Sequence, residues 1–164
     1  MTDISIPSYI DGSAYSFMRW EKVVAQGSPQ LELKKRYEHY NSLGIGDIDG
    51  RNVIACTKKF GRVGDALIIE FSEPISPNNY QLNAIIGDIK DENDKNCDEW
   101  GHIYGSQHSI IEFVVDTSFP TEEEIKIAIR NNQDFKRINS VIPSLNRKNK
   151  VIKIKNLNYN YLCI

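Results

Sequence analysis

Residues 48–71 read IDGRNVIACTKKFGRVGDALIIEF, residues 83–106 read NAIIGDIKDENDKNCDEWGHIYGS, and residues 108–116 read HSIIEFVVD. This part of the chain holds four apolar runs separated by glycine-bearing turns: Val53–Ala55, Ala66–Phe71, Leu82–Ile86 and Ile110–Val115. Each run has the length of a strand and is rich in Ile, Val and Phe, which favours β-structure. The pattern predicts a mainly β or α+β fold, and a small closed barrel would gather the polar loops at one end.

Two capping patterns predict helices on either side of this region. Ser28 suits the N-cap and Pro29 the first turn of a helix over residues 29–40. Thr121 as N-cap, with a glutamate three residues later, predicts a second helix over residues 122–131.

The chain of 164 residues fits a single domain that can bury a full hydrophobic core. We expect a barrel core over about residues 45–118, an N-terminal arm and helix over residues 1–44, and a C-terminal helix and basic tail over residues 119–164. The turn-forming residues of 1–16 predict an extended arm or a short edge strand. Alternating apolar and basic residues over 150–155 predict another strand, whose lysines keep a sheet edge soluble.

Composition argues against several classes of protein. The net charge of −2 gives no overall attraction to nucleic acid or to an anionic membrane. No apolar run reaches the roughly 20 residues of a membrane span. The N-terminal residues lack the basic and apolar regions of a secretory signal, so we expect the protein to stay inside the cell or to leave it by another route. The three cysteines show neither metal-ligand nor disulfide-framework spacing.

Asp88 is the strongest candidate for a functional residue. It follows directly after the buried run that ends in Ala84–Gly87, and burial raises the pKa of a carboxyl group. A carboxylic acid that keeps its proton near neutral pH suits acid–base chemistry. An aspartate after a strand also commonly caps backbone N–H groups, and this structural interpretation stays open.

A long polar loop over residues 91–109 follows, and loops of this length are usually functional or disordered. Its aromatic and histidine side chains could form the rim of a sugar-binding groove together with Lys90, or could simply pin the loop to the surface: Trp100, His102, Tyr104 and His108. The spacing of the two histidines matches no recognised zinc site, and the acidic residues of the loop lack the EF-hand pattern. We therefore expect neither a metal nor a cofactor.

The segments IDGRNVIA, FGRVGDALIIEF, IIGDIKD and SIIEFVVD, in this order, resemble a group of bacterial and phage proteins with double-psi β-barrel domains. That group is related to the three-aspartate ("3D") domains of lytic transglycosylases and, more distantly, to the rare lipoprotein A type. The resemblance covers roughly residues 17–116 and centres on Gly87 and Asp88. It implies a small six-stranded double-psi β-barrel with one or two flanking helices.

The three aspartates of the family pattern map onto this chain only in part. The central one matches Asp88, and the third falls at Glu112. The first falls at or next to Thr57, which we therefore group with the substrate-binding residues, and Asp49 lies upstream as a possible source of the missing charge. The resemblance implies that Asp88 is the acid/base and that Glu112 tunes or orients it.

The activity implied is cleavage of peptidoglycan glycan strands by the lytic transglycosylase route, in which a single carboxylic acid can suffice. The departure at the first aspartate favours a second interpretation, a non-catalytic β-barrel module that binds glycan or protein in a phage tail or a cell-wall assembly. A third is an intracellular effector or toxin built on the same barrel. Without a visible export signal, we expect a cell-wall or extracellular location reached by another route, a virion-associated protein or a cytoplasmic one.

Overall fold

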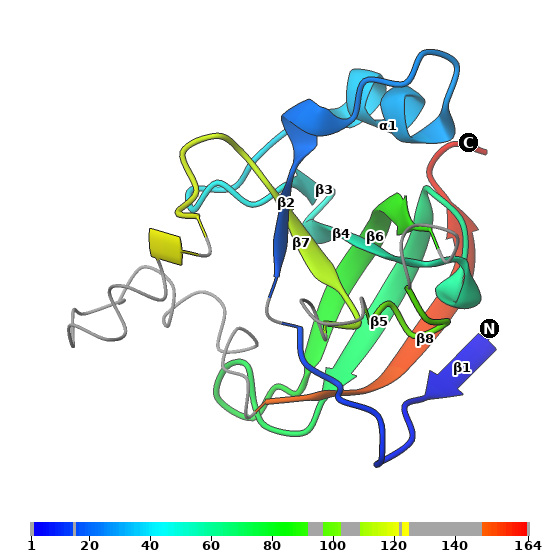
Figure 1. Cartoon of the computed structure of the whole chain (residues 1–164), viewed down its shortest axis with the longest axis vertical. Helices are drawn as coiled ribbons and strands as arrows, with labels where there is room; N and C mark the ends of the chain where they lie inside the picture. Colours follow the sequence, from blue (N-terminus) through cyan, green and yellow to red (C-terminus); the bar gives the residue numbers. More distant parts are fainter. Residues whose placement is uncertain are drawn as a thin grey trace.

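The computed structural model describes residues 2–14, 16–91, 97–102, 109–121, 123–124 and 149–163. This part of the chain is mainly β-structure with one α-helix, as the sequence predicted. The elements in chain order (Figure 1) are β1 (Thr2–Ser5), β2 (Phe17–Arg19), the 3-10 helix η1 (Trp20–Lys22), α1 (Pro29–Tyr37), β3 (Asp47–Ile48), β4 (Arg51–Thr57), the 3-10 helix η2 (Lys58–Phe60), β5 (Asp65–Phe71), β6 (Gln81–Lys90), β7 (Glu112–Val115) and β8 (Val151–Asn160).

The strands form one sheet in the order β1-β8-β5-β6-β4-β7-β2, and β3 pairs with β4 beside this path. The pairs β4–β6 and β2–β7 are parallel, whereas the other pairs along the path are antiparallel. In Figure 1, β7 and β2 run at a steep angle to β5 and β8. Such an angle follows from the twist that accumulates from strand to strand across a sheet. β6 lies near the middle, between β5 and β4.

The predicted closed barrel of six strands is not confirmed. β1 and β2 are the two ends of the sheet path, and the described strands number eight. β1 is the edge strand predicted within residues 1–16, and β8 contains the alternating residues predicted as a strand. Because β8 pairs with both β1 and β5, segments expected to flank the core are part of the main sheet.

Three of the four apolar runs lie entirely on strands, and the fourth begins two residues before β7. β6 is longer than its apolar run. β6 continues through Asp88 to Lys90, so Asp88 lies within a strand and not at the start of a loop. The polar end of β6 stays in the sheet because β4 pairs with it as far as the Thr57–Lys90 position. Hydrogen bonding to a neighbouring strand therefore extends β6 beyond the apolar run Leu82–Ile86.

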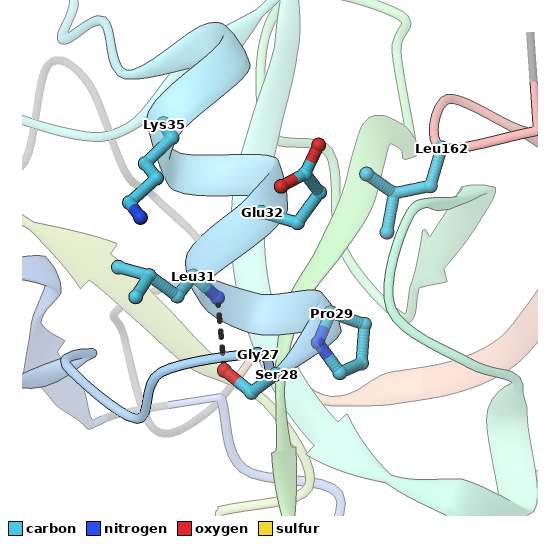
Figure 2. A pocket seen from close by; sticks show the side chains of 7 residues that line it. All are labelled: Gly27, Ser28, Pro29, Leu31, Glu32, Lys35 and Leu162. Carbon is cyan, nitrogen blue, oxygen red and sulfur yellow. Dashed lines mark hydrogen bonds between the residues drawn. The ribbon is translucent and has the colours of Figure 1, made fainter.

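Helix α1 begins as predicted and ends three residues earlier than the predicted position 40. The hydroxyl of Ser28 accepts a hydrogen bond from the backbone N–H of Leu31 at 3.2 Å, and Pro29 is the first helical residue. Figure 2 shows this cap. Leu31 and Leu33 are buried and attach the helix to the core. None of the helices that the structure describes has the length and apolar character needed to cross a membrane.

The N-cap of the second predicted helix is present, which is one of the two hydrogen bonds of the predicted capping box. The hydroxyl of Thr121 accepts a hydrogen bond from the backbone N–H of Glu124 at 3.1 Å. The rest of that predicted helix, like most of the basic tail before residue 149, lies outside the described residues.

Candidate active site

A cavity of about 250 Å³ lies where β2, β4, β6 and β7 meet. It brings together Asp88 and Glu112, the two carboxylates that the sequence placed at the centre of the site, and it also contains Lys90. The complete lining is Met18, Ala55, Asp88, Ile89, Lys90, Asp91, Cys97 and Glu112.

A β-bulge at Gly87 turns Asp88 toward this cavity. Ile54 on β4 pairs with Ile86, but the next residue, Ala55, pairs with Asp88, so Gly87 is the extra residue. Since side chains alternate between the two faces of a strand, a regular register would send Asp88 to the other face of the sheet. Gly87 fits because it has no side chain, and a Cβ atom at this position would overlap with Val53.

Ala55 separates the two carboxylates. It pairs with Asp88 on β6 at one side and with Glu112 on β7 at the other. Paired residues on neighbouring strands point to the same face, and neighbouring strands lie about 4.8 Å apart, which puts the Cα atoms of Asp88 and Glu112 roughly 10 Å from each other. The small side chain of Ala55 leaves space between them, and this space is the floor of the cavity.

Burial raises the pKa of the Asp88 carboxyl group above its usual value of 3.8. Hydrogen bonds from the backbone N–H of Ile89, at 2.9 Å, and from the side chain of Gln30 on α1 favour the ionised form and oppose this effect. Burial dominates because removing a carboxylate from water disfavours its charge. The predicted tuning of Asp88 by the like charge of Glu112 stays a prediction.

Lys90 lies with its amine inside the protein, with only 6% of its side chain exposed. The ammonium group donates hydrogen bonds to the backbone carbonyls of Ser109 at 2.7 Å and Gly101 at 2.9 Å. It also lies 3.4 Å from Oε1 of Glu112, whose side chain is 12% exposed. Lys90 was predicted as a residue at the rim of a groove. In the structure, Lys90 instead connects the cavity to two loop segments, at Gly101 and at Ser109.

Trp100 lies outside the cavity lining and packs on the protein surface. The ammonium group of Lys59 lies 4.6 Å from the centre of its ring, and the ring of Phe60 is 6.2 Å away between centroids. Its segment is further attached through Thr57, whose hydroxyl donates to the carbonyl of Glu99 at 2.6 Å. These contacts match the interpretation in which the loop is pinned to the surface.

His102 also lies outside the lining. Its Nδ1 atom lies 3.2 Å from Oδ2 of Asp98, and its Nε2 atom lies 2.7 Å from the backbone carbonyl oxygen of Asp11. The ring therefore joins its own loop to the segment after β1. Tyr104 and His108, the other two residues proposed for the rim, lie outside the described residues.

Asp49 is far from the cavity. It occupies the turn before β4 in the left-handed region, with φ of 56°, and accepts a hydrogen bond from the hydroxyl of Tyr161 at 2.8 Å. It precedes β4, and the part of this strand from Arg51 to Ala55 alone spans roughly 13 Å. Asp49 therefore does not supply the carboxylate that is missing at Thr57, and Thr57 itself is buried and lies outside the lining.

Sequence reasoning did not single out three residues that other elements bring to the site: Met18, Gln30 and Ala55. Ala55 carried a signal, because a small residue in a β-rich apolar run leaves space beside its neighbours. The others come from segments distant in sequence, and no local pattern connects them with Asp88.

A second cavity of about 300 Å³ lies at the start of α1 (Figure 2). Glu32 and Lys35 of the helix and Leu162 near the C-terminus line it together with Gly27, Ser28, Pro29 and Leu31. Its polar groups belong mostly to the cap and the exposed helix surface. Among the described residues, no group of three or more His, Cys, Asp or Glu side chains is arranged to hold a metal ion.

Comparison with known proteins adds no relative: no family model, no curated protein and no solved structure matches this chain.

Proposed function

We propose that the protein cleaves peptidoglycan glycan strands by a lytic-transglycosylase-like mechanism, with Asp88 as the acid/base. The observation that carries the proposal is the half-buried Asp88 carboxyl group, which has a raised pKa and faces a cavity shared with a second carboxylate. Two carboxyl groups with different surroundings are a common basis for acid–base chemistry on glycosidic bonds.

The reaction needs a single proton carrier. The protonated Asp88 donates its proton to the oxygen of the bond between N-acetylmuramic acid and N-acetylglucosamine, and that bond breaks. The Asp88 carboxylate then removes the proton of the C6 hydroxyl of the muramic acid, whose oxygen bonds to C1 and closes an anhydro ring. Asp88 ends the cycle protonated, and no water is consumed. The raised pKa suits the first step, because it keeps more of the acid protonated near neutral pH.

The size of the cavity fits a limited role in substrate binding. Ligand pockets usually span roughly 300–1,000 Å³, whereas this one measures about 250 Å³. It would receive the reacting part of one sugar, and the rest of the glycan strand would lie along the surface outside it.

The double-psi barrel implied by the resemblance remains part of the proposal. What supports it is the position of Gly87 and Asp88 on β6, between β5 and β4 and next to a parallel neighbour. The proposed chemistry needs only the local arrangement of β4, β6 and β7, so it does not depend on closure of the sheet.

A non-catalytic binding module is the second candidate function. It is favoured by Thr57, which stands at the place of the first family aspartate and is occupied by a hydrogen bond to the carbonyl of Glu99. With Asp49 far away, no carboxylate stands at the first position of the family pattern. A glycan-binding module of a phage tail or cell-wall assembly would retain the pocket without turnover.

Digestion of purified peptidoglycan by wild-type protein and by Asp88→Asn separates these functions. We expect anhydro-muropeptides from the wild type, detected by mass spectrometry, and a rate that is lower by roughly 10²- to 10⁴-fold for Asp88→Asn, because a positioned general acid contributes about that factor.

Asp49→Asn is the matched control. Asparagine tolerates the left-handed backbone of Asp49, and its side-chain oxygen can still accept the Tyr161 hydroxyl. This variant should digest peptidoglycan at the wild-type rate. Equal digestion by Asp88→Asn and wild type would exclude Asp88 as the acid, and binding to sacculi without any products would favour the non-catalytic module.

A further inference from the structure

We infer that Lys90 is a positioning residue that keeps Glu112 ionised and turned toward Asp88, so that Glu112 stabilises positive charge on the reacting sugar while Asp88 carries the proton. The inference rests on the proposed function, since it assigns a role to the second carboxylate of the same cavity. It differs from the family expectation, in which Glu112 would act on Asp88 itself.

The Lys90 amine is surrounded by hydrogen-bond acceptors. Two backbone carbonyls, of Gly101 and Ser109, accept its hydrogen bonds, and the Glu112 carboxylate lies 3.4 Å away. An ammonium group can satisfy several acceptors at once, whereas a neutral amine would leave buried carbonyl oxygens with weaker partners. These acceptors suit a lysine that positions Glu112, and the hydroxyl of Ser109 also lies 3.4 Å from its nitrogen.

Glycine at position 101 allows this arrangement. Gly101 has a φ of 103°, which side chains rarely adopt, and a Cβ atom there would lie 3.2 Å from Cδ of Lys90. The backbone can thus approach the lysine closely enough for its carbonyl to accept the 2.9 Å hydrogen bond.

The charged groups around Glu112 give the two carboxylates different environments. Among the residues that the structure describes, the titratable groups sharing its cavity are Asp88 and Lys90 from β6, Asp91 just after it, and Cys97. Met18 and Ala55, which face it from β2 and β4, carry no charge. A cation within about 4–6 Å favours an ionised carboxylate, whereas burial without a cation favours the protonated form. Both carboxylates are partly buried, and Glu112 has the Lys90 cation beside it.

This division of roles fits the charge changes of the reaction. Cleavage of a glycosidic bond passes through a transition state with positive charge on the sugar ring. A fixed negative charge close to that ring stabilises the transition state more than the neutral substrate. Glu112 would act in this way, and Lys90 would act only through Glu112.

Carbon-13 NMR titration of the side-chain carboxyl groups, without substrate, tests the inference independently of any activity. In the wild type, Glu112 should titrate at a lower pH than Asp88. In Lys90→Met, the midpoint of Glu112 should rise by about 1–3 pH units. Lys90→Gln retains a side-chain donor for the loop carbonyls but has no charge, and it should show the same rise. Lys59→Met removes a lysine that pairs with Glu99 outside the cavity and should leave Glu112 unchanged.

The pH profile of peptidoglycan digestion provides a second measurement. The acidic limb should move to higher pH in Lys90→Gln by the same amount as the Glu112 midpoint, and Lys90→Arg should restore it. An unchanged Glu112 midpoint in Lys90→Gln would overturn the inference and leave Lys90 with a purely structural role. If the wild type gives no digestion products, the proposed function fails, but the titration still decides whether Lys90 holds Glu112 ionised.

Discussion

Gly87 determines where the Asp88 side chain points, because Gly87 has no side chain of its own. The bulge at Gly87 turns Asp88 toward Ala55, and the missing side chain makes room for Val53. Any substitution that adds a Cβ atom must move either the bulge or Val53. The geometry of the candidate acid therefore depends on a neighbour that has no chemistry of its own.

We expect Gly87→Ala to destabilise the protein by about 1–3 kcal/mol, the usual cost of overpacking a tightly packed core. Urea denaturation would measure the change in the free energy of unfolding. Val53→Ala removes the atoms that the new methyl group would meet, so the double variant should lose less stability than the two single losses added together. Strict additivity would show that Gly87 and Val53 do not compete for space.

At the residue scale, the sequence pointed to Asp88 and Glu112, but it also pointed to Asp49, which lies away from the cavity, and it did not assign Asp91 to the site. Asp88 and Glu112 do line one cavity. Lys90 was expected at an exposed rim because it adjoins a polar loop, yet its partners come from Gly101 and Ser109. Those contacts depend on how the loop returns to the sheet, and no local pattern encodes that path.

At the scale of elements, the hydrophobic runs located strands but did not give their ends. The run Ile110–Val115 begins two residues before β7. The apolar run in β6 ends at Ile86, whereas pairing with β4 carries the strand to Lys90. The short strands β2 and β3 were not predicted, because their two or three residues give no periodicity. The order in which the strands pair could not be predicted from the sequence either, because β4 and β6 lie side by side although β5 comes between them in the chain. By contrast, the cap of α1 is a local pattern, and its prediction was correct.

The cap of α1 provides a quantitative test at this scale. Ser28→Ala removes the acceptor of the Leu31 N–H and should lower the free energy of unfolding by about 1 kcal/mol. Urea denaturation of Ser28→Ala beside Ser42→Ala, an exposed serine outside the helix, would measure it. A loss of equal size in both variants would contradict a specific contribution of the cap.

For the molecule as a whole, Asp88 has a stability cost that depends on pH. Because its folded pKa lies above the usual 3.8, the folded protein binds more protons than the unfolded chain between these two values. The free energy of unfolding therefore falls as the pH rises through this range, and Asp88 destabilises the fold at neutral pH. Residues of active sites commonly lower the stability of the fold because their function requires such surroundings.

We expect Asp88→Asn to be more stable than the wild type at pH 7 and similar to it near pH 3, where both side chains are uncharged. Urea midpoints at the two pH values would show this. Asparagine retains an oxygen that can accept the Ile89 N–H. A loss of stability at pH 7 would instead favour the structural interpretation in which the Asp88 carboxylate caps the backbone.

The two tryptophans lie in different environments, so their fluorescence reports on different parts of the protein. Trp20 is completely buried in the core against Tyr40, whereas Trp100 lies at the surface, in the segment whose Gly101 carbonyl binds Lys90. Emission from the first indole reports the integrity of the interior, and emission from the second reports the loop segment that binds Lys90. Selective replacement of either ring would let one fluorescence spectrum distinguish loss of the fold from movement of the loop alone.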